Sequence, residues 1–327
     1  MLYTIVTRAS HLEIKLNKPN TGFDIGGLIL SSTKDVFPDL FGNSHFRQLI
    51  GDIDFKGLAD STFLIAKEKH EGAFTRENAE HILEHSWGPI QLFQIASWIV
   101  KDNNINFDCL FLYLEDKKQT FRNRRNIWNT NSEGVYSNTL FNEDELNDAV
   151  NWEYTLLPYL LESYDESNNY NVFVGGNNEP TYRTANPHLV VENRFSRCLD
   201  FIRVARSESF LPVKIASYIG ALESLFDIAG ELSHQVSERT AKLLSGDITT
   251  RVKNYNIVKE AYDIRSKYVH GSLLSKKHRS SDKLKEVSRN LDEILRQLIQ
   301  LLLKKYPELA QMKKEELTEW YKKLILG

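Results

Sequence analysis

The first part of the chain has the apolar pattern of short strands. Up to about residue 75, segments such as 12–16 and 62–66 alternate apolar and polar positions between Gly, Pro, Asn and Asp residues, which predicts strands separated by turns. The strongly apolar run 107–114 is bounded by polar residues and predicts a buried strand.

Helical patterns lie between and after these strands. Thr75 and the acidic residue that follows it predict the start of a helix continuing to Val100, with a break allowed at Pro89 because proline lacks the intrahelical donor. A second helix is predicted from Asn142 towards Tyr159. Strands and helices together indicate an α+β domain over residues 1–185.

The pattern becomes helical from Pro187 onward. Between residues 168 and 187 the composition shifts to Asn, Gly, Pro and Thr, which favours turns, so we place the domain boundary at 185. Apolar residues then recur every three or four positions and predict five helices and a short C-terminal one. Residues 186–327 are therefore predicted to form an all-α helical bundle. The clearest stripe comprises Ile215, Ile219, Leu222, Leu225 and Phe226.

Charge is distributed unevenly between these two parts. The net charge of the 327 residues is only −3. Residues 1–185 contain 16 Lys and Arg against 26 Asp and Glu, whereas residues 186–327 contain 25 against 18, so the parts carry −10 and +7. A basic C-terminal part would attract a polyanion, and an acidic N-terminal part could sit against it. The alternative is two unrelated solvated surfaces.

Cysteines and apolar runs limit the class of protein. Cys109 and Cys198 are far apart and form no C-x-x-C pair, so we expect neither a disulfide framework nor a thiolate metal site. The sequence shows no signal peptide, and no apolar run approaches the ~18 residues that span a bilayer. We therefore expect a cytoplasmic protein that does not enter a membrane.

Arg265 and His270 lie five positions apart near the end of a predicted helix that stops at Gly271. Arginine is a permanent cation whose planar fork matches phosphate oxygens, and histidine titrates nearest neutrality. Such a pair suits metal-free RNA cleavage, in which the 2′-hydroxyl attacks the adjacent phosphorus. Histidine can move a proton while arginine neutralises the charge on the phosphorane.

Helix geometry places the two side chains ~140° apart, so they should diverge within one chain. Two features could make them converge. The helix ends at Gly271, which frees the direction of His270, and a two-fold dimer would bring two copies of the motif to one groove. The alternative is a pair that hydrogen-bonds carbonyls and complements the helix dipole.

Three segments strengthen the motif through their order and spacing, namely Ala221-Leu222-Glu223-Ser224-Leu225-Phe226, Glu238-Arg239-Thr240-Ala241-Lys242-Leu243-Leu244 and Tyr262-Asp263-Ile264-Arg265-Ser266-Lys267-Tyr268-Val269-His270-Gly271. In these segments the C-terminal part resembles the HEPN superfamily of helical bundles, most closely its Apea-like branch. No family is recognised for residues 1–185.

The resemblance implies a bundle that dimerises through the motif face, and often a metal-independent endoribonuclease used as a toxin or in anti-phage defence. The family's arginine and histidine fall on Arg265 and His270. Many catalytic members of the wider superfamily have Asn, Asp or His after the arginine, where this chain has Ser266, which offers weaker polar support. We therefore expect a homodimeric ribonuclease without metal or cofactor. The alternative is a non-catalytic HEPN module for dimerisation or RNA binding.

Several residues are candidates to support this pair. Glu223 lies on an otherwise apolar helix and is expected to brace Arg265 or Arg239, or else to form an ordinary salt bridge. Arg239 is expected to reach phosphate, to pair with Glu223 or to serve a structural role. His278 flanks a loop and is expected to be solvated. Further candidates for RNA contact are Lys267, Lys276 and Lys277.

The N-terminal part offers a second candidate surface for RNA. A basic cluster at 117–125 with Phe121 and Trp128 beside it could hold single-stranded RNA by charge and stacking, with an exposed basic hairpin as the alternative. This part is also the candidate receiver of a phage or host trigger. The arginines expected to contact RNA are Arg122, Arg124 and Arg125.

A metal-dependent enzyme is a third hypothesis. His81 and His85 lie four positions apart on a predicted helix, a spacing that can present two imidazoles to one metal, with Glu80 and Glu84 adjacent. A third ligand is not evident, and a solvated helical face is the alternative interpretation.

Overall fold

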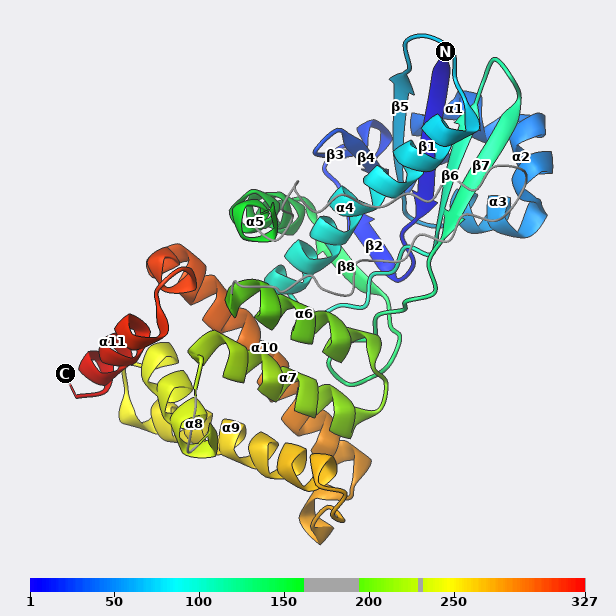
Figure 1. Cartoon of the computed structure of the whole chain (residues 1–327). Coiled ribbons are helices and arrows are strands. Elements are labelled where there is room, and N and C mark those ends of the chain that lie inside the picture. Colours follow the sequence, from blue (N-terminus) through cyan, green and yellow to red (C-terminus); the bar gives the residue numbers. More distant parts are fainter. Residues whose placement is uncertain (162–193, 229–231, 327) are drawn as a thin grey trace, which may run out of the picture.

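An antiparallel sheet lies in the N-terminal region and helices form the C-terminal region (Figure 1). The computed structural model describes residues 1–161, 194–228 and 232–326. The six-stranded sheet has the order β3-β4-β5-β1-β6-β7, and neighbouring strands are antiparallel. A separate parallel pair joins β2 (Leu12–Lys15) to β8 (Thr139–Asn142). The sheet strands are β1 (Leu2–Arg8), β3 (Phe23–Ile25), β4 (Leu28–Ser31), β5 (Phe63–Lys69), β6 (Cys109–Leu114) and β7 (Gln119–Arg124). The strands predicted at 12–16, 62–66 and 107–114 are confirmed as β2, β5 and β6.

Both faces of the sheet are covered, which explains why β6 is apolar at every position. Successive side chains on a strand point to opposite faces, and all six residues of β6 are buried. Leu110 and Leu112 pack in a core with α4 (Arg76–Val100). Phe111 and Tyr113 pack in a second core with the short helices on the other face. These helices are α1 (Pro38–Phe41), α2 (Ser44–Ile50) and α3 (Asp52–Ala59), and the turns η1 (Pro19–Thr21) and η2 (Lys34–Val36) precede them.

The helix α4 is continuous through Pro89, so the predicted break does not occur. Its start at Thr75 is confirmed, because Thr75 and Asn78 form a reciprocal capping box. Proline in a helix interior costs about 3 kcal/mol. Burial offsets that cost here, since α4 packs into two cores: Trp87 and Phe93 lie in the sheet core, and Trp98 lies in the core of the C-terminal helices.

The C-terminal region is helical, as predicted, and its apolar stripe is buried. The turn η3 (Lys276–His278) follows α9, and η4 (Pro307–Ala310) follows α10. In the part of the chain that the structure describes, no helix is long and apolar enough to cross a membrane. The helices are α6 (Arg194–Ser207), α7 (Leu211–Phe226), α8 (Leu232–Leu244), α9 (Ile248–Val269), α10 (Ser281–Lys305) and α11 (Lys314–Leu326).

Two helices of the N-terminal region contribute to the C-terminal core. Ile95 and Ile99 of α4 belong to that core, as do Trp152 and Leu156 of α5 (Glu143–Leu161). The predicted boundary at residue 185 lies outside the described residues. Because α4 and α5 are part of both cores, the sheet and the helices are joined by continuous apolar packing.

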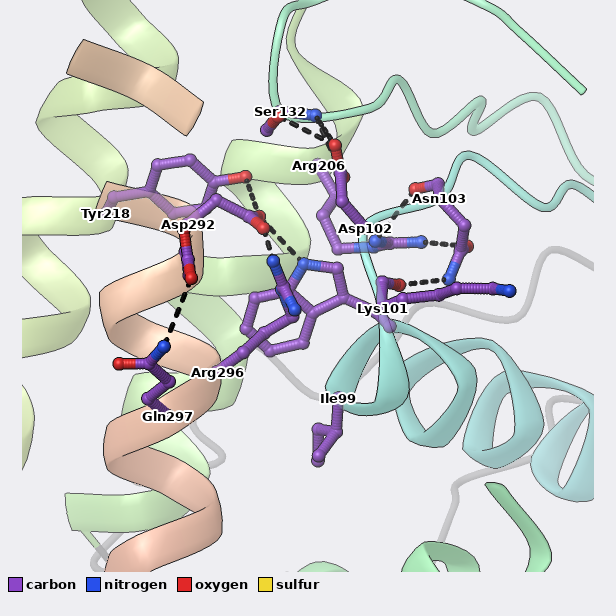
Figure 2. A network of polar contacts seen from close by, with 12 residues as sticks. Ile99, Lys101, Asp102, Asn103, Ser132, Arg206, Tyr218, Asp292, Arg296 and Gln297 are labelled. Carbon is purple, nitrogen blue, oxygen red and sulfur yellow. Dashed lines mark hydrogen bonds and ion pairs between the residues drawn. The ribbon is translucent and has the colours of Figure 1, made fainter. Parts of the chain in front are cut away.

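A buried polar network lies where α4 meets α7 and α10 (Figure 2). Asp292 of α10 is fully buried, and its Oδ1 accepts hydrogen bonds from Trp98 Nε1 and the Tyr218 hydroxyl, both at 2.8 Å. Its Oδ2 accepts from Arg296 Nε at 2.9 Å. Nearby, Arg206 of α6 donates to the carbonyl oxygen of Asn103 at 3.1 Å. Asp292 thus ties α4, α7 and α10 together by directional bonds, and Arg206 ties α6 to the chain after α4.

The loop 131–135 fixes the turn between α6 and α7. Gly134 has φ +74°, and a Cβ at this position would lie 2.5 Å from the Ser209 carbonyl oxygen. The Thr130 hydroxyl donates to the Glu208 carbonyl oxygen at 2.6 Å. The N-terminal region therefore holds in place the turn that carries Phe210, the residue before α7.

Candidate active site

Arg265 is a half-buried residue of α9 that faces α7. Its Nη2 lies 3.5 Å from Glu223 Oε2, and its guanidinium lies over the Tyr262 ring at 5.5 Å from the ring centroid. The other carboxylate oxygen of Glu223 is buried and accepts no hydrogen bond from the described residues. Burial, followed by the Glu223 carboxylate, raises the pKa of Tyr262. The structure thus brings Glu223 to Arg265, one of the two predicted partners.

His270 occupies the C-cap of α9 and is exposed. Its backbone N–H donates to the Ser266 carbonyl oxygen at 3.1 Å, while Gly271 adopts φ +69° and ends the helix. Gly271 therefore takes the predicted terminating position. Among the residues that the structure describes, the imidazole has no hydrogen-bond or ion-pair partner. Both ring nitrogens remain available to a ligand.

The two motif residues thus have different surroundings within one chain. Arg265 is held against α7 by Glu223, whereas His270 is in solvent beyond the last turn of α9. Ser266 lies between them, and its carbonyl supports the helix end. One chain alone presents a braced guanidinium and an unsupported imidazole.

An exposed apolar patch surrounds the end of α9. Large apolar side chains at a helix end usually find cover, but four remain exposed here. The Phe210 and Tyr268 rings contact each other edge to face at 5.9 Å, which joins the turn before α7 to the motif helix. The four exposed residues are Phe210 (56% exposed), Tyr268 (40%), Val269 (54%) and Leu273 (83%). We call them the motif patch.

The segment after the motif is anchored by a buried ion cluster. His278 is buried, contrary to the prediction that it is solvated, and its Nε2 lies 3.0 Å from Glu260 Oε1. Lys277 and Lys283 also pair with Glu260, at 2.6 and 3.1 Å. Burial alone would raise the pKa of Glu260, but the hydrogen bonds from Lys277, His278 and Lys283 outweigh it and lower the pKa to about 2. The cluster fixes η3 against α9 only a few residues beyond His270.

This cluster makes stability depend on pH. Because the pKa of Glu260 is lower in the folded chain than its ordinary 4.5, its contribution is fully present above pH 4.5 and is lost as pH falls towards 2. Because the Lys277 side chain is largely in solvent, screening limits this contribution to about 1 kcal/mol. In urea unfolding, Glu260→Gln is expected to be less stable than the parent at pH 6, with a difference that shrinks below pH 4. The exposed Glu293→Gln, on α10 outside the cluster, is the matched control. Parallel pH profiles for Glu260→Gln and parent would refute the assignment.

The three lysines expected to contact RNA differ in whether they already form an ion pair. Lys267 pairs with Asp263 at 2.8 Å, and Lys277 is engaged by Glu260. Lys276 is exposed and forms no ion pair with the described residues. Lys276 is therefore the lysine of this group best placed to contact an anion without first breaking an ion pair.

Arg239 is a structural residue and is not part of the candidate site. It is buried on α8, where Nη1 donates to the Phe226 carbonyl oxygen at 2.9 Å and Nη2 donates to Gln235 at 3.0 Å. Its guanidinium lies over the Tyr321 ring of α11, 4.5 Å from the centroid. The predicted roles in phosphate contact and in pairing with Glu223 are wrong, because α11 covers the side chain.

The basic cluster of the N-terminal region lies apart from Arg265. Figure 1 shows β7 in the sheet region, well separated from the end of α9. Arg124 pairs with Asp54 at 3.4 Å, and Arg125 pairs with Glu84 at 3.6 Å while covering the Trp87 ring. Arg122 is exposed on this edge strand. The structure does not bring this cluster to the motif.

The histidine pair on α4 is not arranged as a metal site. The His81 and His85 rings stack with centroids 3.8 Å apart, and His85 Nδ1 lies 2.8 Å from the His81 carbonyl oxygen. Within residues 1–161, 194–228 and 232–326, no group of three or more His, Cys, Asp or Glu side chains could hold a metal ion. The metal hypothesis therefore lacks a third ligand in the described structure.

Comparisons with protein-family models, curated proteins and solved structures found no match for this chain. The resemblance to HEPN bundles thus rests on the three sequence segments, and the candidate site rests on its own geometry.

Proposed function

We propose that the protein is a metal-independent endoribonuclease of the HEPN type, with an active site assembled from Arg265 and His270 of two chains. The observation that supports this most is the state of the motif in one chain: a guanidinium braced by Glu223, and an exposed imidazole that has no partner among the described residues. The motif patch beside it is an apolar surface that a second copy would cover.

In the proposed reaction, the 2′-oxygen attacks the adjacent phosphorus and the bond from phosphorus to the 5′-oxygen breaks. His270 of one chain accepts the proton of the 2′-hydroxyl, and the leaving 5′-oxygen takes its proton from water, so one His270 suffices for the reaction. Arg265 neutralises the charge that builds on the phosphorane. The products are a 2′,3′-cyclic phosphate and a 5′-hydroxyl end.

The surroundings of the motif supply the other proposed roles. The +7 charge of residues 186–327 favours RNA, and Lys276, near the helix end, forms no ion pair with any residue that the structure describes. The N-terminal region contacts the turn before Phe210, which in turn contacts Tyr268. We propose that a phage or host trigger acts through this route in a cytoplasmic toxin or defence effector.

A non-catalytic module for dimerisation or RNA binding is the competing function. The Arg265–Glu223 pair favours it to the extent that a guanidinium already neutralised by a carboxylate has less charge to offer a phosphate. In this function RNA would be bound and protected but not cut.

The product ends separate these functions. Incubation of the purified protein with end-labelled RNA in EDTA is expected to give fragments with cyclic phosphate and 5′-hydroxyl ends, because the proposed chemistry uses only side chains. Resistance of the fragment ends to phosphatase, followed by sensitivity after acid opening, would identify the cyclic phosphate. Cleavage that requires added Mg²⁺, or protection without cleavage, would contradict the proposal.

A further inference from the structure

A pocket of about 320 Å³ lies between α8, the first half of α9 and the end of α11. It is separate from the candidate active site, since the 19 residues from Arg251 to His270 correspond to about 28 Å along a helix. The contacts of Arg265 and His270 do not include its lining. The pocket therefore needs an explanation of its own.

Two cations in the pocket have donors to spare. Arg251 uses Nε to donate to the Ser245 carbonyl oxygen at 2.8 Å, and its two terminal nitrogens have no partner among the described residues. Within the described part of the chain, the Lys242 ammonium donates to the Ile325 carbonyl oxygen alone, at a long 3.5 Å. Guanidinium and ammonium groups from facing helices are well suited to share one phosphate or carboxylate.

The remaining walls suit a flat ring. The Tyr255 side chain lines the pocket with the apolar Ala241 and Val252, and its hydroxyl lies 3.1 Å from His234 Nδ1, which fixes the ring. Aromatic and aliphatic walls of this kind accept a planar body. The Glu238 carboxylate also lines the pocket and can accept a hydrogen bond from an N–H or O–H group of a ligand.

We propose that this pocket binds a small phosphate monoester of a heteroaromatic compound, of the size of a mononucleotide. The phosphate would lie between Lys242 and Arg251, and the ring would lie against Tyr255. The volume is at the lower end of the range for ligand pockets, ~300–1,000 Å³, which fits one such molecule. This inference is independent of the proposed nuclease function.

Calorimetric titration of the full-length protein with AMP tests the proposal. Adenosine and inorganic phosphate serve as half-ligands, and both are expected to bind at least tenfold more weakly than AMP because each lacks one of the two contacts. Equal binding of inorganic phosphate and AMP would overturn the role of the ring wall. Equal binding of adenosine and AMP would overturn the role of the cations.

Variants locate the site. Lys242→Met is expected to weaken AMP binding at least tenfold, whereas Lys253→Met, which removes an exposed lysine of α9 outside the pocket lining, is expected to leave it unchanged. Arg251→Lys keeps the charge and tests the fork geometry if a larger change unfolds the chain. AMP binding retained in both Lys242→Met and Arg251→Lys would overturn the proposal. Binding lost in His270→Ala would do the same, because it would place AMP in the motif site.

Discussion

Replacement of Asp292 by alanine is expected to lower the free energy of unfolding by about 3–5 kcal/mol, the range for removing one partner from a buried ion pair. The carboxylate is fully buried and accepts from Trp98, Tyr218 and Arg296 (Figure 2). Its loss would leave two neutral donors and one guanidinium without their acceptor in a site with little access for water.

Urea unfolding followed by tryptophan fluorescence measures this effect, since Trp98 donates directly to Asp292. Glu293→Ala is the matched control, because Glu293 is the next residue of α10, is exposed, and its carboxylate accepts a hydrogen bond from Gln297 on the helix surface. The control is expected to change stability by less than about 1 kcal/mol. An Asp292→Ala variant as stable as this control would show that the network does not hold the helices together.

The shared core also changes what truncation can reveal. Removal of residues 1–185 would take away α4 and α5, whose Trp98, Ile99 and Trp152 form part of the C-terminal core. The remaining helices would expose that apolar surface to water, at roughly 25 cal/mol per Å². Loss of activity in such a shortened chain would therefore report loss of folding and would not show regulation by the N-terminal region.

Elements with a strong periodic pattern could be predicted from the sequence. The apolar run of β6 is buried on both faces, and the stripe of α7 is buried in the helical core. The helix end at Gly271 and the link between Glu223 and Arg265 also follow from residue type and spacing. For the strand, the stripe and the helix end the residue's own chemistry determines the outcome locally, whereas Glu223 and Arg265 lie 42 residues apart and their pairing was only one of the contacts expected for Glu223.

Features that depend on which surface meets a helix could not be predicted in this way. The apolar pattern of α4 is the same whether the helix packs into one core or into two. Its packing in both cores therefore could not be predicted from the sequence. Burial of His278 depends on Glu260, which lies 18 residues earlier in the chain. The choice among the three roles expected for Arg239 depends on Tyr321 of α11, which covers its guanidinium.

One missed network did leave a signal in the sequence. Ser288, Asp292 and Arg296 are spaced by four and form a polar row on α10 beside its apolar stripe, and Ser288 and Asp292 are fully buried. A polar row of this kind resembles the solvated flank of an amphipathic helix. The hydrogen bonds from Trp98 and Tyr218 to Asp292 show that this polar row is buried between helices.

Loss of either motif side chain is expected to abolish the proposed RNA cleavage. His270→Ala removes the group that moves protons, and we expect its rate to fall by about 10²–10⁴-fold. Arg265→Ala removes the cation opposite the phosphorane, with an expected loss of about 10²–10³-fold. His270 is exposed and has no side-chain partner in the described chain, so its replacement should leave the unfolding midpoint unchanged. Parent-level cleavage by both variants would exclude the proposed site.

Mixed dimers decide whether the site is shared between chains. Arg265→Ala and His270→Ala chains with different tags can be co-expressed and purified over both tags. Each homodimer lacks one residue type altogether, whereas a mixed dimer keeps one Arg265 and one His270 on different chains. If a two-fold axis brings both motifs to one groove, the mixed dimer is expected to cut RNA at least about tenfold faster than either homodimer.

Pairing either single variant with the double variant supplies the control, because those dimers still lack one residue type and should remain inactive. If the mixed dimer is as inactive as this control, Arg265 and His270 of one chain must act together, and the shared groove is ruled out.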